Sequence, residues 1–416
     1  MSERFSSRLR PFPLTGPGWP GSVQPENVIS FAGSQPASDL LELSGIHKAL
    51  SKIQPSWSVE QTAHAVFGEY LPLREQLCGR MARLTGLTAK PEQLLPAACS
   101  LTALELVIRI LTEPGDTVLV GNPASADRLR MFEKHGLKAI PAACDRDGVI
   151  IASARAQLEA CRPRLMYVMP TCSGPEGHVW SRDRKKGLLG LAHEFGLPVI
   201  EDDTCRELIY KEDMTAGREF ERAGERDTEQ SDSLLSLEGR IEGGQVIYLG
   251  ALPGMEAAGL GLPAGWIAAD SKAIGMIVKA QQAVNDCTPL LAAELELSRL
   301  LKGDTLDEAI KRLAAACRTR IKRAEELLAS CMPEAGWLEP QGGMFLWLEL
   351  PEGLDAQALQ RAAIRQGVDF QPGSAFYAGD GPRNTVRLNI CGITDAEMEE
   401  GIRRLAEAVG EFTARS

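Results

Sequence analysis

Short apolar runs alternate with amphipathic helical patterns between about residues 90 and 270. The runs predict strands over residues 117–120, 139–141, 165–169, 198–201 and 245–249. Strands that are separated by helices pair in parallel, and the helices cover both faces of the resulting sheet. The pattern therefore predicts an α/β fold with a mostly parallel central sheet.

The hydrophobic pattern changes beyond about residue 285. Long helical patterns extend through Leu328, and a second set of strands and helices ends in a predicted helix over Asp395 to Val409. Thr394 is placed to cap that helix, with Glu397 completing a capping box. Residues 211–240 are polar and lack an apolar period, so we expect a solvated surface loop there.

The length of the chain predicts two domains. With 416 residues, of which 44% are hydrophobic, it can bury a large core and exceeds the usual size of one domain. We expect a proline-containing arm over residues 1–27 and a large domain over 51–285. A smaller α/β domain is expected to combine residues 28–50 with residues 286–416.

Composition excludes several classes of function. The net charge of −11 argues against a nucleic-acid partner, which would need a basic face. No apolar stretch approaches the roughly 18 to 20 residues that span a bilayer, and we expect a cytoplasmic protein without a membrane partner. The 10 cysteines lack zinc-like spacing, so reduced thiols and no metal site are predicted.

One segment bears on the chemistry. The apolar run Val246–Gly250 is followed by the turn Ala251–Gly254 and a glycine-rich stretch that leads to Gly265 and Trp266. This order resembles fold-type I aminotransferases, especially the 2-aminoadipate type and the aminotransferase-like domain of GntR-type regulators. Other phrases in family order support the resemblance: Val28–Gly33, Leu71–Glu75, Tyr167–Pro170, Gly174–Gly177, Val199–Asp203, Gly342–Trp347 and Val386–Asn389.

The resemblance implies a Schiff-base lysine that this chain lacks. The family pattern reads Tyr-x-Gly-Ser-Phe-Ser-Lys, and its lysine falls on Gly254. A phosphate-binding arginine falls on Gly261 or Pro263, and no lysine or arginine lies between Arg240 and Lys272. Such enzymes need an amine to form the imine and to move the proton. We therefore predict that the chain is not a competent pyridoxal phosphate transaminase.

Further cofactor contacts of the family also fall on unsuitable residues. The asparagine and the tyrosine that contact the ring oxygen fall on Gly174 and Cys205, and the stacking aromatic falls on Ala124 or Ser125. A tyrosine from the second subunit falls on Phe67. The remnants are Ser100, at the start of a helix that could face a phosphate, and Asp202, which could pair with the pyridine nitrogen. On this basis we expect no cofactor.

The family positions that bind the substrate carboxylate match this chain better than the cofactor positions do. Arg387 falls on the arginine that grips the α-carboxylate, and Gly33 belongs to the segment beside it. The resemblance also implies a homodimer. The leading hypothesis is a degenerate, noncatalytic or repurposed family member that binds an amino acid or another carboxylate.

Two alternatives remain open. The first is a working aminotransferase that holds pyridoxal phosphate noncovalently through Asp202 and Ser100. The second is other chemistry in the same cavity, in which Cys99, Cys172 and Cys205 form a nucleophilic or soft-metal site near Asp202 or His178. Buried thiols that only fill space are the simpler interpretation of these cysteines.

Overall fold

The central element of the fold is an eight-stranded sheet with the strand order β2-β9-β8-β7-β6-β3-β4-β5. A computed structural model describes residues 27–45, 70–210, 232–255, 262–282 and 291–415. The strands are β2 Leu94–Ala97, β3 Thr117–Asn122, β4 Lys138–Asp145, β5 Gly148–Val149, β6 Leu165–Val168, β7 Val199–Asp202, β8 Val246–Ala251 and β9 Gly265–Ala268. Strands β8, β7, β6, β3 and β4 are parallel neighbours. The predicted mostly parallel sheet is confirmed.

The sequence pattern missed the outer strands of this sheet. β9 pairs antiparallel with both β8 and β2, and β5 pairs antiparallel with β4. These strands are short, and β2 and β9 contain a proline and a glycine, which weaken a strand signal. Pairing with a neighbouring strand therefore determines their conformation more than their own sequence does.

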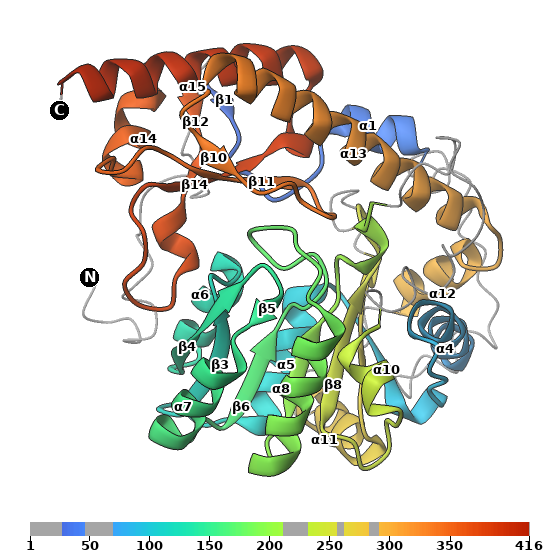
Figure 1. Cartoon of the computed structure of the whole chain (residues 1–416). Helices are drawn as coiled ribbons and strands as arrows, with labels where there is room; N and C mark the ends of the chain where they lie inside the picture. The colour runs from blue at the N-terminus through green and yellow to red at the C-terminus, as the bar shows by residue number, and fades with distance from the viewer. Residues whose placement is uncertain (1–26, 46–69, 211–231, 256–261, 283–290, 416) are drawn as a thin grey trace, which may run out of the picture.

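Helices bury both faces of the sheet, as Figure 1 shows. In β3, Val118 and Val120 join one core cluster and Leu119 joins the other, which is the period-2 alternation of a strand covered on both sides. The cluster of the two valines includes α5 (Ser100–Leu111) and α11 (Ser271–Gln282). The opposite cluster includes α7 (Ile151–Cys161), α8 (Arg182–Phe195) and α10 (Leu234–Glu238).

A second, smaller layered unit lies above the carboxyl ends of the parallel strands in Figure 1. Its four-stranded antiparallel sheet runs β10 (Gly336–Trp337), β11 (Phe345–Glu349), β14 (Thr385–Asn389) and β13 (Gln371–Pro372). It is accompanied by α14 (Ala356–Arg365) and α15 (Asp395–Arg415). Strand β1 (Ile29–Ser30) pairs with β12 (Val368–Asp369), so an N-terminal segment and a C-terminal segment lie side by side in this unit.

Five further α-helices complete the described part of the chain. They are α1 (Ser38–Ser44), α4 (Leu71–Thr85), α6 (Ala126–Lys134), α12 (Leu291–Leu300) and α13 (Thr305–Cys331). Helix α13 contributes Leu313 to the core cluster of the large sheet and Ile321 to that of the small unit. A boundary at residue 285 stays a prediction, because the long helix α13 belongs to both cores.

Two local predictions from the sequence have different outcomes. At the start of α15, the Thr394 amide donates to Glu397 at 2.8 Å and the Glu397 amide donates to the Thr394 hydroxyl, so the capping box is confirmed. The predicted loop over 211–240 is wrong for residues 234–238, which form α10. The buried Glu201 carboxylate accepts the first amides of that helix, from Leu234 and Leu235. Residues 211–231 lie outside the described part of the chain.

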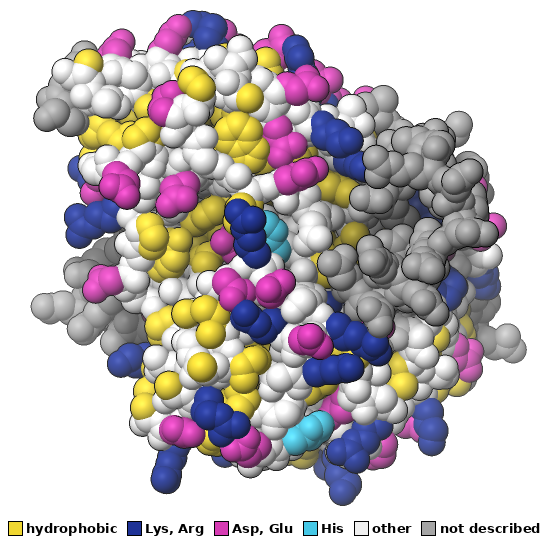
Figure 2. Space-filling model, viewed as in Figure 1, with side chains coloured by type: hydrophobic (Ala, Val, Ile, Leu, Met, Phe, Trp, Pro, Cys, Tyr) yellow, Lys and Arg dark blue, Asp and Glu magenta, His cyan; other side chains and the backbone are white. Residues whose placement is uncertain are grey.

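The visible surface carries charges of both signs. On the face shown in Figure 2, lysine and arginine side chains are interspersed with aspartate and glutamate side chains. Among the helices that the structure describes, none combines the length and apolar character needed to cross a membrane.

Candidate functional site

A cavity of about 200 Å³ opens beyond the carboxyl ends of β6, β7 and β8. In α/β sheets ligands bind outside these strand ends, near the point where the strand order reverses. The chain runs from β3 to β4 on one side and then returns to β6 on the other side of β3, which makes this the switch point. The predicted positions Ser100, Gly174, Cys205, Gly254 and Arg387 all line the cavity.

Asp202 lies beneath one end of the cavity rather than on its wall. Its carboxylate is 0% exposed and accepts hydrogen bonds from the Tyr167 hydroxyl at 2.6 Å and the Thr204 hydroxyl at 2.6 Å. The Arg128 guanidinium donates to it through Nε at 3.1 Å. The carboxylate that sequence analysis assigned to a ring nitrogen is therefore already engaged by the chain itself.

Arg128 connects the two cofactor remnants that were predicted from sequence. It comes from the first turn of α6, and its Nη2 donates to the Ser100 hydroxyl at 3.0 Å. Burial works against its charge, but the Asp202 carboxylate, together with Tyr167 and Cys205, raises the pKa of Arg128 above its usual value. The guanidinium therefore stays charged, and it forms part of the cavity wall.

The opposite end of the cavity carries Arg387 on β14. Its Nη2 donates to the Gly33 carbonyl at 2.9 Å and lies 3.3 Å from the Ser34 hydroxyl. Its guanidinium carbon stacks 4.2 Å from the centre of the Phe345 ring and 5.1 Å from that of Phe376. The structure thus brings together the two predicted substrate residues, Gly33 and Arg387.

Among the residues that the structure describes, none places a carboxylate in direct contact with the buried Arg387. Its side chain makes no ion pair with any residue that the structure describes, and its Nε is buried without a hydrogen-bond partner. Burial lowers the pKa of Arg387 to about 10, with Asp127 acting in the opposite direction. A buried cation of this kind is stabilised by an incoming anion.

Gly254 lies in the turn that follows β8 and lines the cavity between these two ends. Its φ of 77° is in the left-handed region that favours glycine. No lysine is among the described residues that line the cavity. Gly261 and Phe67, which were also assigned from sequence, lie outside the described residues.

The cysteines do not form the reactive cluster that was considered. Cys172 and Cys205 line the cavity, whereas Cys99 caps α5 by accepting the Thr102 amide. Burial raises the pKa of Cys205 to about 12 and that of Cys172 well above its usual value, so neither is poised as a thiolate. The described ranges contain no group of three or more His, Cys, Asp or Glu placed to hold a metal ion.

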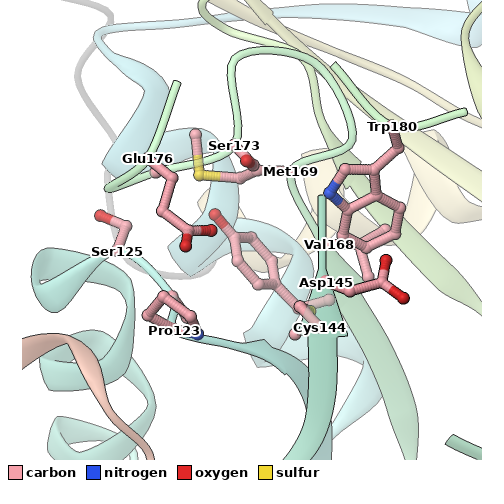
Figure 3. Close-up of a pocket in the computed structure, with 13 residues that line it drawn as sticks. Pro123, Ser125, Cys144, Asp145, Val168, Met169, Ser173, Glu176 and Trp180 are labelled. Carbon is pink, nitrogen blue, oxygen red and sulfur yellow. The ribbon is translucent and has the colours of Figure 1, made fainter. Parts of the chain in front are cut away.

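Figure 3 shows a smaller pocket of about 20 Å³ beside the cavity, with Ser125, Met169, Ser173 and Glu176 among its lining residues. The Glu176 carboxyl points toward the interior of this pocket, and Trp180 lies on its other side. Burial raises the pKa of Glu176 to about 7. This carboxyl can therefore change its charge near neutral pH.

Sequence analysis missed Arg128, Tyr167, Thr204 and Glu176 as parts of the site. Arg128 is separated from Asp202 by 74 residues, and nothing in its helix distinguishes it from the neighbouring Arg130. Tyr167 could have been found from alternation, because on β6 it belongs to the same core cluster as Ile200, two residues before Asp202 on β7.

The fold and the cavity define an α/β protein of the fold-type I aminotransferase class. The family model described as aminotransferase class I and II matches residues 60–405, so the chain belongs to this family. The predicted family and fold class are confirmed.

Individual relatives agree with this assignment. The chain is 27% identical to aromatic-amino-acid aminotransferase 1 of Thermococcus litoralis, covering 94% of this chain and 89% of that protein. It is 29% identical to the 2-aminoadipate transaminase of Thermus thermophilus, covering 93% and 91%. The α-aminoadipate aminotransferase of T. thermophilus, solved with N-(5′-phosphopyridoxyl)-L-leucine, superimposes with a TM-score of 0.77 at 27% identity, covering 99% and 96%.

These comparisons overturn the expectation of no cofactor. The chain belongs to an aminotransferase family, and a similar structure holds a phosphopyridoxyl group, which points to pyridoxal phosphate. The expectation was wrong because it counted the cofactor contacts of the family that this chain has lost and gave too little weight to those that remain. Ser100, at the start of α5, and the Asp202 carboxylate are both in place, although Arg128 occupies the carboxylate and residue 254 offers no amine.

Proposed function

We propose that this chain binds an amino acid or another carboxylate through Arg387, and that it holds pyridoxal phosphate without a covalent imine. Arg387 carries the first part of the proposal. It is 6% exposed, lines the cavity and has a buried Nε with no hydrogen-bond partner in the described part of the chain. A carboxylate can accept from this Nε and from the terminal nitrogens in a bidentate arrangement.

The absence of an amine at residue 254 supports the second part. Pyridoxal phosphate supplies an electron sink when it is bound, but an imine to the protein needs a lysine. The Gly254 turn adopts φ 77°, so a lysine placed there would also be strained. We therefore expect Gly254→Lys alone not to restore transamination.

The names of the relatives support an amino-acid ligand. They act on 2-aminoadipate and on aromatic amino acids, which share the α-carboxylate that we assign to Arg387. The same resemblance supports a homodimer, and the scattered cysteines support a reducing, cytoplasmic compartment.

A working aminotransferase with a noncovalent cofactor is the second candidate. The placement of Ser100 and Asp202 favours it, since Ser100 could contact the phosphate and Asp202 could contact the ring once Arg128 is displaced from it. Chemistry through Cys205 is not favoured, because burial raises the pKa of its thiol to about 12.

Calorimetric titration with L-2-aminoadipate tests the carboxylate assignment. We expect saturable binding that is weakened at least about 30-fold in Arg387→Ala, since losing one partner of a buried charge pair costs about 2–5 kcal/mol. Arg383→Ala is the matched control, because Arg383 is near the same strand but has an 81% exposed side chain. Equal affinities of wild type and Arg387→Ala for L-2-aminoadipate would refute the role of Arg387.

Borohydride reduction after incubation with pyridoxal phosphate tests the covalent state. We expect peptide mass spectrometry to find no reduced phosphopyridoxyl adduct on a peptide from the cavity. A stoichiometric adduct on one lysine would show that an imine forms and would contradict the noncovalent cofactor of both candidates.

A further inference from the structure

We propose that Arg128 is a specificity-determining residue that competes with a cationic ring for the Asp202 carboxylate. A protonated pyridine ring would then bind at this end of the cavity only by displacing the Arg128 guanidinium. The proposal rests on the proposed function in one respect only, which is that the same cavity binds the ligand.

The placement of the two side chains is the first argument. Asp202 is 0% exposed and is not part of the cavity wall, whereas Arg128 is 9% exposed and is part of it. Nε of Arg128 lies 3.1 Å from Oδ2 of Asp202. The guanidinium therefore stands between the cavity and the carboxylate.

The remaining capacity of the carboxylate is the second argument. Oδ2 accepts from Tyr167 at 2.6 Å as well as from Arg128, and Oδ1 accepts from the Thr204 hydroxyl at 2.6 Å and its amide at 3.4 Å. A ring N–H that reached this group would need the place of one of these donors. Two cations beside one carboxylate would also repel each other.

The contact with Ser100 is the third argument. Because Nη2 of Arg128 donates to the Ser100 hydroxyl at 3.0 Å, the guanidinium is held from two elements, α5 and the end of β7. A ring cation can replace the positive charge beside Asp202, but it leaves Arg128 to find another partner. The pocket therefore discriminates against ligands that carry a cation at this position.

Binding of 4′-deoxypyridoxine 5′-phosphate, which has no aldehyde and cannot form an imine, tests the competition. Its dissociation constant is measured by fluorescence for wild type, Arg128→Met and Arg130→Met. We expect at least about tenfold tighter binding to Arg128→Met. Arg130→Met, on the same helix and with a 51% exposed side chain, is the control and should match wild type. Unchanged or weaker binding to Arg128→Met would overturn the proposal.

Inorganic phosphate distinguishes competition from direct anion binding. If Arg128 only blocks the carboxylate, Arg128→Met should gain affinity for the ring compound and gain none for phosphate. If Arg128 is instead a ligand for the phosphate group, the variant should lose affinity for both probes, which would contradict the proposal.

A measurement on wild-type protein covers the case in which Arg128→Met does not fold. The probe is compared with an analogue in which carbon replaces the ring nitrogen. We expect wild type to prefer the nitrogen-containing ring by less than about threefold, since Arg128 already neutralises Asp202. A preference above about tenfold in wild type would show that the ring reaches the carboxylate unopposed.

Failure of this proposal and failure of the proposed function have different signatures. Loss of the Arg128 effect leaves L-2-aminoadipate binding and its dependence on Arg387 intact. Loss of the Arg387 effect leaves the comparison of the two ring compounds intact.

Discussion

The two ends of the cavity each carry a buried arginine, and the two arginines have opposite electrostatic situations. Arg387 and Arg128 are 6% and 9% exposed. Burial lowers the pKa of Arg387 to about 10, whereas Asp202, together with Tyr167 and Cys205, raises the pKa of Arg128 in spite of burial. Similar burial thus leaves one cation in need of an anion and the other satisfied, and the difference is the partner.

This contrast distinguishes the binding of a carboxylate ligand from the covalent chemistry of aminotransferases. The Arg387 end is prepared for a carboxylate, which a ligand can supply. The Asp202 end is closed by an internal ion pair, and the turn between the two ends offers glycine instead of an amine. Under the proposed function, the cavity keeps an affinity for amino acids without forming an imine to the protein.

The largest expected effect comes from breaking the closed end. Asp202→Ala leaves Arg128 buried without its carboxylate, and removing one partner of a buried pair costs about 3–5 kcal/mol in the free energy of unfolding. Chemical denaturation measures the loss. The double variant Asp202→Ala/Arg128→Met should recover most of it, and a loss below about 1 kcal/mol in the single variant would mean that the pair is not buried as described.

A second effect concerns Glu176, which lines the smaller pocket beside the cavity. The folded pKa of Glu176 is about 7, raised from 4.5 by burial, so this group favours folding fully below pH 4.5 and loses that contribution as pH rises through 7. Glu176→Gln should therefore be about 1–2 kcal/mol more stable than wild type at pH 8, after a discount for partial exposure, with little difference at pH 4.5. Melting temperatures at the two pH values measure this, and parallel pH profiles would contradict it.

We expect removal of the Arg387 charge at the open end to increase the stability of the folded protein. Because the folded pKa of Arg387 lies below its usual value, the charged form is disfavoured by folding throughout the range below pH 10. Arg387→Met should raise the free energy of unfolding of the unliganded protein by about 1 kcal/mol at pH 7, after the lost contacts to Gly33 and Phe345 are subtracted. Denaturation without ligand tests this, and a clear destabilisation would show that the cation is satisfied within the protein.

The smallest effect concerns the second contact of Arg128. Ser100→Ala removes the hydroxyl that accepts from Nη2, and a single hydrogen bond of this kind contributes about 0.5–1.5 kcal/mol. Thermal denaturation should show a loss in that range. In Arg128→Met the same serine substitution should have a smaller effect, and equal losses in both backgrounds would argue against the contact.

Much of the fold could be predicted from the sequence, because buried parallel strands are continuous apolar runs such as Leu165–Val168. Strand β9 could not, since its four residues become a strand only through pairing with β8 and β2. Helix α10 was missed because a buried carboxylate from another strand, Glu201, binds its first amides.

The residues of the site also divide into those that the sequence predicted and those that it did not. Arg387 and Asp202 were predicted from their place in strand phrases of the family. Arg128 was not found, because its role depends on contacts to Ser100 and Asp202, which are distant in sequence and are brought together by the sheet. A resemblance identifies family positions, whereas a new partner for a family residue is visible only in three dimensions.

The central claim is that the cavity has one open and one closed charged end. A crystal structure with L-2-aminoadipate bound and no cofactor added tests it most directly. The account predicts a carboxylate within hydrogen-bond distance of Nε of Arg387, while Arg128 stays on Asp202. A carboxylate bound to Arg128, with Arg387 left unpaired, would contradict it.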